Sequence, residues 1–84
     1  FQYNKLAFKS MMTRWGSCSP KNNISLNLLM AELTKDLQDY IILHELLHTR
    51  IKDHGKGFWL ELDRLTGDAK GIQKELKEKY ILYN

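Results

Sequence analysis

The spacing of apolar residues changes once along the chain, near residue 35. Before that point, the segments Leu6–Ser17 and Asn23–Met30 alternate roughly between apolar and polar positions, as half-buried β-strands do. The residues "CSPKNN" separate the two segments and include the only proline of the chain, Pro20. This is turn chemistry, so the pattern predicts an antiparallel hairpin.

From about Lys35 the apolar residues recur at helical spacing. Thr34 is placed as an N-cap and Asp36 lies in the first turn, so a helix is predicted to begin here. Apolar side chains fill nearly every side of this helix, which is typical of a helix buried in the middle of a domain. The positions at helical spacing are Leu37, Tyr40, Ile41, His44, Leu47, His48 and Ile51.

Two shorter helices are predicted after the glycine-containing segment "DHGKG". The first covers about Lys56–Thr66 and ends at Gly67, and the second covers about Asp68–Lys79. The order of strand, strand and three helices predicts an α+β domain, with the helices on one side of a small antiparallel sheet. Their apolar faces are Phe58, Leu62 and Leu65 in the first helix, and Ile72, Leu76 and Tyr80 in the second.

Composition narrows the class of protein. The 84 residues, 43% of them hydrophobic, form one globular domain at most, and no stretch is apolar for long enough to cross a bilayer. The 13 basic residues exceed the 10 acidic ones only slightly and are dispersed, so charge gives weak support for a nucleic-acid partner. The oligomeric state and the substrate identity are not predicted.

The first residue of the chain and its cysteine give indications of the cellular compartment. The chain begins at Phe1 without a signal segment, so we expect residues 1–84 to be a single domain cut from a longer protein. Cys18 is the only cysteine and cannot form an internal disulfide, which suits a reducing compartment. A cytoplasmic location is therefore expected.

The segment "HELLHTRIKDH" concentrates three histidines and one glutamate in the predicted buried helix and just after it. Four residues turn a helix by about 400° and advance it by about 6 Å, so His44 and His48 project from the same face. Two imidazoles can then share one metal ion. Glu45 lies about 100° further round, where its carboxylate can reach a water on the metal without being a ligand.

A catalytic zinc usually takes three protein ligands and keeps one position open. If the helix continued through His54, that residue would lie about 240° round and about 9 Å along from His48, pointing away from the ion. The helix must therefore end first, and Asp53 and Gly55 favour a break around residues 51–55.

Glu61 on the following helix is the competing third ligand, and Asp63 is a weaker version of the same arrangement. We favour His54 because one turn of chain is enough to close the site at this short spacing. Histidines of a buried helix can also be hydrogen-bonded core residues without a metal. Glu45 argues against that interpretation, since burying its charge is costly unless a dication lies nearby.

One zinc ion in this site would activate water for amide hydrolysis, with Glu45 accepting the proton of that water and passing it to the leaving amine. The substrate would be a peptide or protein. An edge strand could bind it in extended form, and the segment "NISLN" is the candidate strand.

The runs "TRWGSCSPKNNISLNLLM" and "DYIILHELLHTRIKDHGKGFW" resemble the YgjP-like predicted metal-dependent hydrolases, zincin-type metallopeptidases more loosely similar to the SprT-like proteases. The resemblance covers roughly Thr13–Trp59. It implies a minimal zincin-like domain whose active-site helix carries the HExxH motif, with His44, His48 and His54 as zinc ligands and Glu45 as the catalytic base.

The chain departs from the family pattern at Asp53 and Gly55, where we expect asparagine and serine. These changes would alter the turn that delivers His54 without removing a ligand. The histidine spacing is also that of the metzincins, but Ile51 stands where metzincins place glycine and no methionine turn follows. That assignment is rejected.

An alternative function is a non-catalytic, metal-stabilised module that binds protein or DNA. A structural zinc would need no base at Glu45 and would normally be closed by a fourth protein ligand. Several other residues have open roles. Trp15 and Trp59 are expected in the core rather than the cleft, Cys18 as a bystander, Arg14 and Arg50 as solvated charges, and Asp39, Glu61 and Asp63 as possible partners of the ligand histidines.

Overall fold

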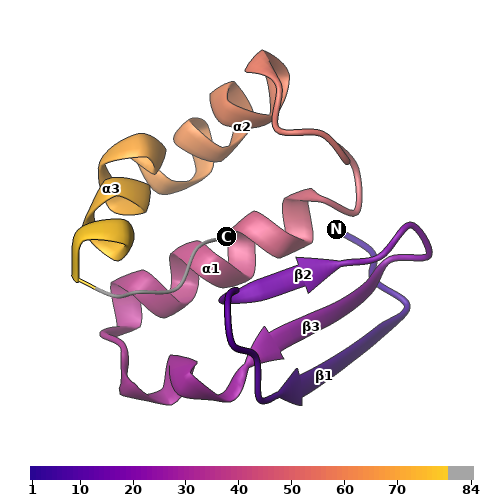
Figure 1. The fold of residues 1–84 in the computed structure, drawn as a ribbon. Coiled ribbons are helices and arrows are strands. Elements are labelled where there is room, and N and C mark those ends of the chain that lie inside the picture. The colour runs from indigo at the N-terminus through magenta and orange to yellow at the C-terminus, as the bar shows by residue number, and fades with distance from the viewer. Residues whose placement is uncertain (80–84) are drawn as a thin grey trace.

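The α1 helix is the centre of the molecule, because it lies between a small sheet and a pair of helices (Figure 1). The computed structural model describes residues 1–79. The elements in chain order are β1 (Lys5–Lys9), β2 (Gly16–Cys18), β3 (Asn23–Asn27), the short 3-10 helix η1 (Leu28–Glu32), α1 (Lys35–Leu47), α2 (Lys56–Thr66) and α3 (Ala69–Lys79). The predicted α+β class with three helices is confirmed.

The sheet is mixed, with strand order β1-β3-β2. The predicted hairpin exists as β2 and β3, which pair antiparallel. The first predicted strand is in fact two strands, since β1 crosses to the other edge of β3 and pairs with it in parallel. A purely antiparallel sheet was therefore the wrong expectation. Both edges of β3 are occupied, so the prediction that "NISLN" offers a free edge to a substrate is also wrong.

Asn27 is the last residue of β3 and also binds the segment that connects β1 to β2. Its side chain is fully buried and its Nδ2 donates to the backbone carbonyls of Met11 (3.0 Å) and Arg14 (2.7 Å). Its Oδ1 accepts a bond from the backbone N–H of Leu29, which begins η1. The loop between β1 and β2 is thus attached to the end of β3. The strand predicted to reach Met30 ends three residues earlier.

The α1 helix begins where predicted, with the Thr34 side chain accepting a bond from the N–H of Leu37. It ends at Leu47, before the expected break at residues 51–55, and His48 is its C-cap. Thr49 donates its hydroxyl to the carbonyl of Leu46 at 2.7 Å, an alternative bond that competes with continuation of the helix. The chain therefore turns directly after the HExxH motif.

The core is formed where α1 meets the sheet on one side and α2 and α3 on the other. The Tyr40 hydroxyl donates to Gln73 Oε1 at 2.7 Å and joins α1 to α3. Gly67 ends α2 with a φ of 92°, a left-handed conformation that glycine adopts at little cost. The predicted Tyr80 of the third helix lies outside the described residues. The buried residues include Ile24, Leu26, Ile41, Leu47, Phe58, Leu62 and Leu76.

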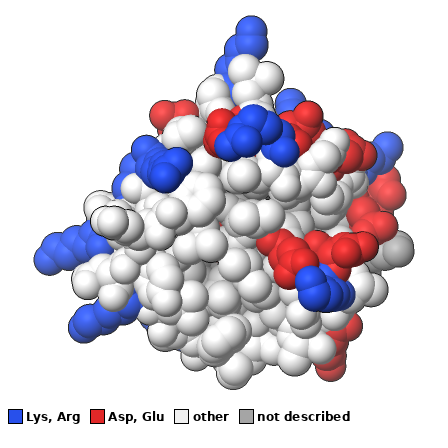
Figure 2. Space-filling model, turned by 180° about the vertical axis from the view of Figure 1, so that it is seen from behind, with Lys and Arg blue, Asp and Glu red and all other residues white. Residues whose placement is uncertain are grey.

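Figure 2 shows the face that points away from the viewer in Figure 1. Basic and acidic side chains both occur on it, and neither sign dominates. That face is largely uncharged at its centre, with Lys, Arg, Asp and Glu nearer its margins (Figure 2). Every residue of β1 is exposed, including the apolar Leu6 and Phe8. In the described part of the chain, no helix has both the length and the apolar character that crossing a membrane requires.

Candidate metal centre

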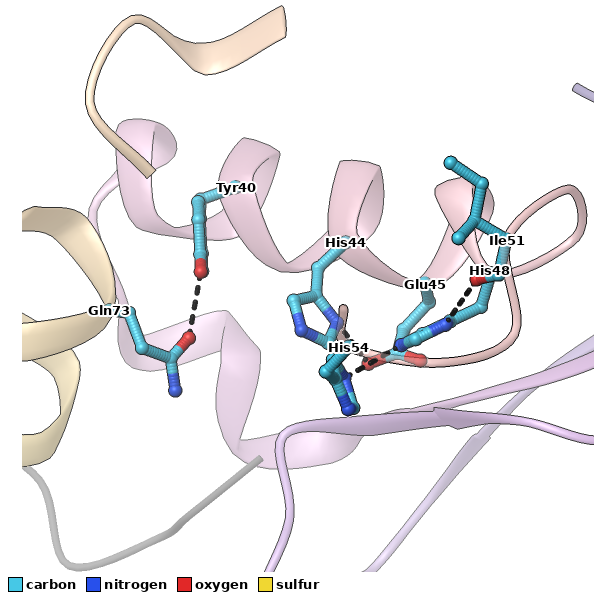
Figure 3. A network of polar contacts seen from close by, with 7 residues as sticks. All are labelled: Tyr40, His44, Glu45, His48, Ile51, His54 and Gln73. Atoms are coloured by element: carbon cyan, nitrogen blue, oxygen red, sulfur yellow. Dashed lines mark hydrogen bonds and ion pairs between the residues drawn. The ribbon is translucent and has the colours of Figure 1, made fainter. Parts of the chain in front are cut away.

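Three imidazoles converge beside the C-terminal end of α1 (Figure 3). His44 and His48 lie one turn apart on the helix and are buried, and the exposed His54 returns from the loop that follows. One possible ligand atom from each residue lies within 4.8 Å of the others, and His48 Nε2 is 2.9 Å from His54 Nε2. The early end of α1 thus brings together the three histidines that the sequence predicted.

A backbone carbonyl orients the middle imidazole. His48 Nδ1 lies 2.9 Å from the carbonyl oxygen of Ile51, which can only accept a hydrogen bond. The proton of neutral His48 is therefore held on Nδ1, and Nε2 presents its lone pair to His54 and the centre of the cluster. Ile51 was expected inside the helix, and its role depends on the turn having already formed.

The donor set fits a zinc ion. His44 Nε2 is buried and makes no hydrogen bond to any residue of the described chain, while His44 Nδ1 lies 3.1 Å from Glu45 Oε2. A buried ring nitrogen without a partner is unfavourable in a metal-free protein. A catalytic zinc site typically has three protein ligands, and the cluster offers three imidazoles.

The protonation equilibria of the cluster also favour metal binding. Loss of solvent around the ring is the largest cause that lowers the pKa of buried His48 and also of His54, whose ring is partly covered although the residue is exposed, and the neighbouring imidazoles lower both further. A lowered pKa keeps each ring neutral near pH 7. Neutral imidazole is the form that binds a metal.

Phe58 at the start of α2 packs against all three imidazoles. Its ring is stacked on His48 at a centroid distance of 4.5 Å and meets His44 and His54 edge-on at 5.1 and 5.0 Å. It is completely buried. Sequence periodicity placed Phe58 in the core, but contact with the histidines could not be read from that pattern, because it depends on the angle at which α2 meets α1.

Glu45 lies against the backbone of β2. Its side chain is 2% exposed, and a Cβ atom placed on Gly16 would lie 2.8 Å from Glu45 Cγ and 3.1 Å from Oε2. A side chain at residue 16 would therefore occupy space that the carboxylate uses. The glycine of "RWGSC" was not singled out from the sequence, and a glycine inside a predicted strand was the available signal for such a close approach.

A cavity of about 500 Å³ opens between β2 and the histidine cluster. All three residues of β2 line it, as do Glu45 and the three histidines. This cavity can hold a small part of an extended chain next to the carboxylate. It is the cleft in which chemistry at the cluster would take place.

The three acids considered as partners of the histidines make their described contacts elsewhere. Asp39 pairs with Lys35 at 2.8 Å, and Asp63 accepts a bond from the backbone N–H of Ala69 at 2.9 Å. Glu61, the competing third ligand, accepts a hydrogen bond from Arg64 Nε at 3.0 Å, and this bond lowers its pKa. Among the described residues, the cluster contains His54 and not Glu61.

The remaining residues with open roles divide between core and cleft. Trp15 is in the core at 3% exposure, as expected, whereas Trp59 is half-buried with its ring 6.4 Å from that of His54. Cys18 lines the cavity but lies outside the histidine cluster, and burial raises the pKa of its thiol. Arg14 also lines the cavity, while Arg50 lies 4.7 Å over the Phe1 ring.

Comparison with known proteins agrees with this geometry. The family model described as the YgjP-like metallopeptidase domain matches residues 1–79. A comparison with curated proteins gives no match.

Two solved structures share the fold. The metallopeptidase zymogen of Pyrococcus abyssi abylysin is 23% identical, with a TM-score of 0.80 over 94% of this chain and 80% of that one. The metallopeptidase zymogen of Methanocaldococcus jannaschii jannalysin is 30% identical, with a TM-score of 0.75 over 93% of this chain and 81% of that one.

Proposed function

Because the chain belongs to the YgjP-like metallopeptidase family, we propose that it cleaves peptide bonds with one zinc ion held by His44, His48 and His54 and with Glu45 as the general base. The observation that carries this proposal is the convergence of three imidazoles within 4.8 Å beside a buried carboxylate. Both the nature of the ion and the role of each residue are parts of the proposal.

The three histidines provide neutral nitrogen donors, of which His48 is oriented by the Ile51 carbonyl. When bound, zinc would polarise the substrate carbonyl and would lower the pKa of a water molecule toward about 7. His44 lies in the last turn of α1, His48 caps the helix, and the short segment from His48 to His54 keeps the third donor close to them. Such an arrangement limits the reorganisation that would otherwise accompany catalysis.

Glu45 is the residue that moves the proton. Its carboxylate accepts a proton from the attacking water and then gives it to the leaving amine. Gly16 lacks a side chain and so leaves the space that the Glu45 carboxylate occupies against β2. The charge of a buried carboxylate is otherwise unfavourable, so its position beside three metal-binding imidazoles supports this role.

The strand β2 is the proposed docking edge for the substrate backbone. It is an edge of the described sheet, and its three residues line the cavity next to Glu45. An extended peptide paired with β2 would pass directly over the histidine cluster. This assignment replaces the central strand β3.

Substitution of Glu45 by glutamine tests the mechanism. We expect Glu45→Gln to bind zinc with unchanged stoichiometry and to lose about 100- to 10,000-fold in peptidase kcat, the range typical of a positioned general base. Zinc content is measured by atomic emission, and hydrolysis with an internally quenched peptide library. Peptidase activity equal to that of the unaltered protein would contradict the role of Glu45.

The metal assignment needs its own measurement. An anomalous-scattering map at the zinc edge should show one peak among the three imidazoles. A non-catalytic binding module remains the competing function. It would be supported if zinc were bound but no peptide in the library were cleaved.

A further inference from the structure

Two more cavities continue from the metal centre along α2 and α3. The first, of about 580 Å³, shares His54 with the catalytic cavity and extends to Trp59 and Lys70. The second, of about 360 Å³, shares Trp59 and Lys70 with the first. Trp59 and Lys70 line both cavities, so the two form one groove, and His54, a proposed zinc ligand, is a wall that this groove shares with the catalytic cavity. We call it the lysine groove, defined by Lys56, Trp59, Lys70, Lys74 and Lys77.

The lysine groove is strongly basic for so small a surface. Its four lysines are accompanied by a single acidic lining residue, Asp63, whose Oδ1 already accepts a bond from the N–H of Ala69. Lys74 has a loose, exposed ion pair with Glu78 at 3.9 Å, which contributes little in solvent. The groove therefore keeps a net positive charge although the charges of the whole chain are nearly balanced.

Lys70, Lys74 and Lys77 are spaced four and three residues apart on α3, so they lie along one face of that helix. Seven residues of helix are about 10 Å long, which is roughly the length of three residues of extended peptide. The basic face therefore matches a short segment of a substrate chain.

Trp59 connects the groove to the metal centre. Its ring packs edge-on against Phe58 at 5.7 Å, and Phe58 in turn supports the three imidazoles. Lys70 Nζ lies 5.4 Å from the centre of the Trp59 ring. The indole thus offers a fixed apolar surface for the aliphatic part of a bound side chain, with a cation beside it.

We propose that the lysine groove binds an acidic segment of the substrate on one side of the scissile bond, so that the enzyme prefers peptides carrying clustered Glu or Asp there. This inference rests on the proposed peptidase function. A peptide whose backbone occupies the catalytic cavity can continue past His54 into the groove. The short basic face and its single tryptophan favour a peptide over a nucleic acid, which would use a longer basic track and several stacking residues.

Matched peptides test this preference in the zinc-loaded protein. One library of quenched peptides is prepared with three Glu, three Gln or three Lys on either side of a shared central sequence. We expect kcat/KM to be about tenfold higher for Glu than for Gln on one side only, and the ratio to fall toward one as salt rises from 50 to 500 mM. A ratio of one on both sides at low salt would overturn the inference.

Charge reversal identifies the responsible surface. The double variant Lys70→Glu/Lys74→Glu should lose the Glu preference and favour the Lys peptide. The double variant Lys5→Glu/Lys9→Glu makes the same change of net charge on exposed β1, outside the lysine groove, and should keep the preference. An equal loss in both variants would assign the effect to net charge and overturn the groove.

A binding measurement separates this inference from the proposed function. Fluorescence anisotropy of a labelled Glu-containing peptide is followed with zinc-loaded Glu45→Gln protein and with its Lys70→Glu/Lys74→Glu derivative. Binding that the double variant abolishes would support the groove even if no peptide were ever cleaved, an outcome that would overturn the peptidase function alone. Tighter binding of a single-stranded oligonucleotide of equal charge, lost in the same variant, would replace the acidic peptide as the occupant.

Discussion

The space above Gly16 is filled by the side chain of Glu45, and a methyl group there would force the carboxylate to move. We predict that Gly16→Ala lowers kcat by about 10- to 100-fold, since small displacements of a catalytic group have effects of that size. Zinc content should not change because the three histidines are untouched. Steady-state kinetics and metal analysis measure the two effects.

Gly57 supplies a matched control for the Gly16 variant. A Cβ at Gly57 would meet no atom within 4 Å, and alanine is the better helix former in α2. Gly57→Ala should therefore retain full activity. If Gly16→Ala also turned over substrate at the normal rate, close contact with β2 would not be what positions Glu45.

Phe58 is predicted to act on metal affinity through the rings that it supports. Phe58→Leu should cost about 1 to 2 kcal/mol of stability because it removes buried apolar atoms, and should weaken zinc binding by about tenfold, the effect expected for loss of an outer-shell partner. Zinc affinity is measured by competition with a chromophoric chelator. Leu62→Val perturbs another fully buried residue of α2 and should leave zinc affinity unchanged; equal weakening in both would indicate general loosening.

At the scale of elements, the end of α1 determines which residue would complete the proposed metal centre. We predict that His54→Ala weakens zinc binding by several orders of magnitude, because one of three donors is lost from the cluster. Glu61→Ala removes only the exposed bond with Arg64 and should bind zinc normally. Isothermal titration with zinc compares the two variants, and the opposite ranking would make Glu61 the third ligand.

The helices could be predicted from sequence because the information for them is local. Each signal for α1 involves residues that are close in sequence. These signals are the Thr34 cap, the apolar spacing of the helix and the four-residue separation of His44 and His48. The pairing of β1 could not be predicted in the same way, since alternation identifies a strand but not its neighbour. The connection depends on Asn27 bonding to carbonyls 13 and 16 residues earlier.

In the candidate site, too, some residues could be predicted from the sequence and others could not. Its titratable residues lie within one short segment and can be recognised as a motif, and the resemblance to a known family predicts the same residues. The residues that position them lie far away along the chain or act through the backbone. Gly16 reaches Glu45 only when β2 packs on α1, and the carbonyl of Ile51 reaches His48 only when the helix ends early.

At the scale of the whole molecule, metal and fold should depend on each other. The histidines that would bind zinc also join α1 to the loop and, through Phe58, to α2. A ligand that binds only the folded state adds about 4 kcal/mol when present at 1,000 times its Kd, a large fraction of the stability of a domain this small. We predict a clear fall in Tm on chelation, followed by calorimetry with and without excess zinc. The His44→Ala variant should show little response to the chelator, and an unchanged Tm in the unaltered protein would indicate that folding is independent of metal.

The exposed strand β1 should open more easily than the rest of the domain. Its five residues are held by the ladder to β3 and contribute no buried side chain to the core. By contrast, β3 buries Ile24 and Leu26 in the core, and β2 lies against Glu45 of α1. Local opening costs least where apolar contacts are few. Fluctuations of the sheet should therefore begin at β1, the margin opposite the histidine cluster, and leave the alignment of Glu45 and the three imidazoles intact.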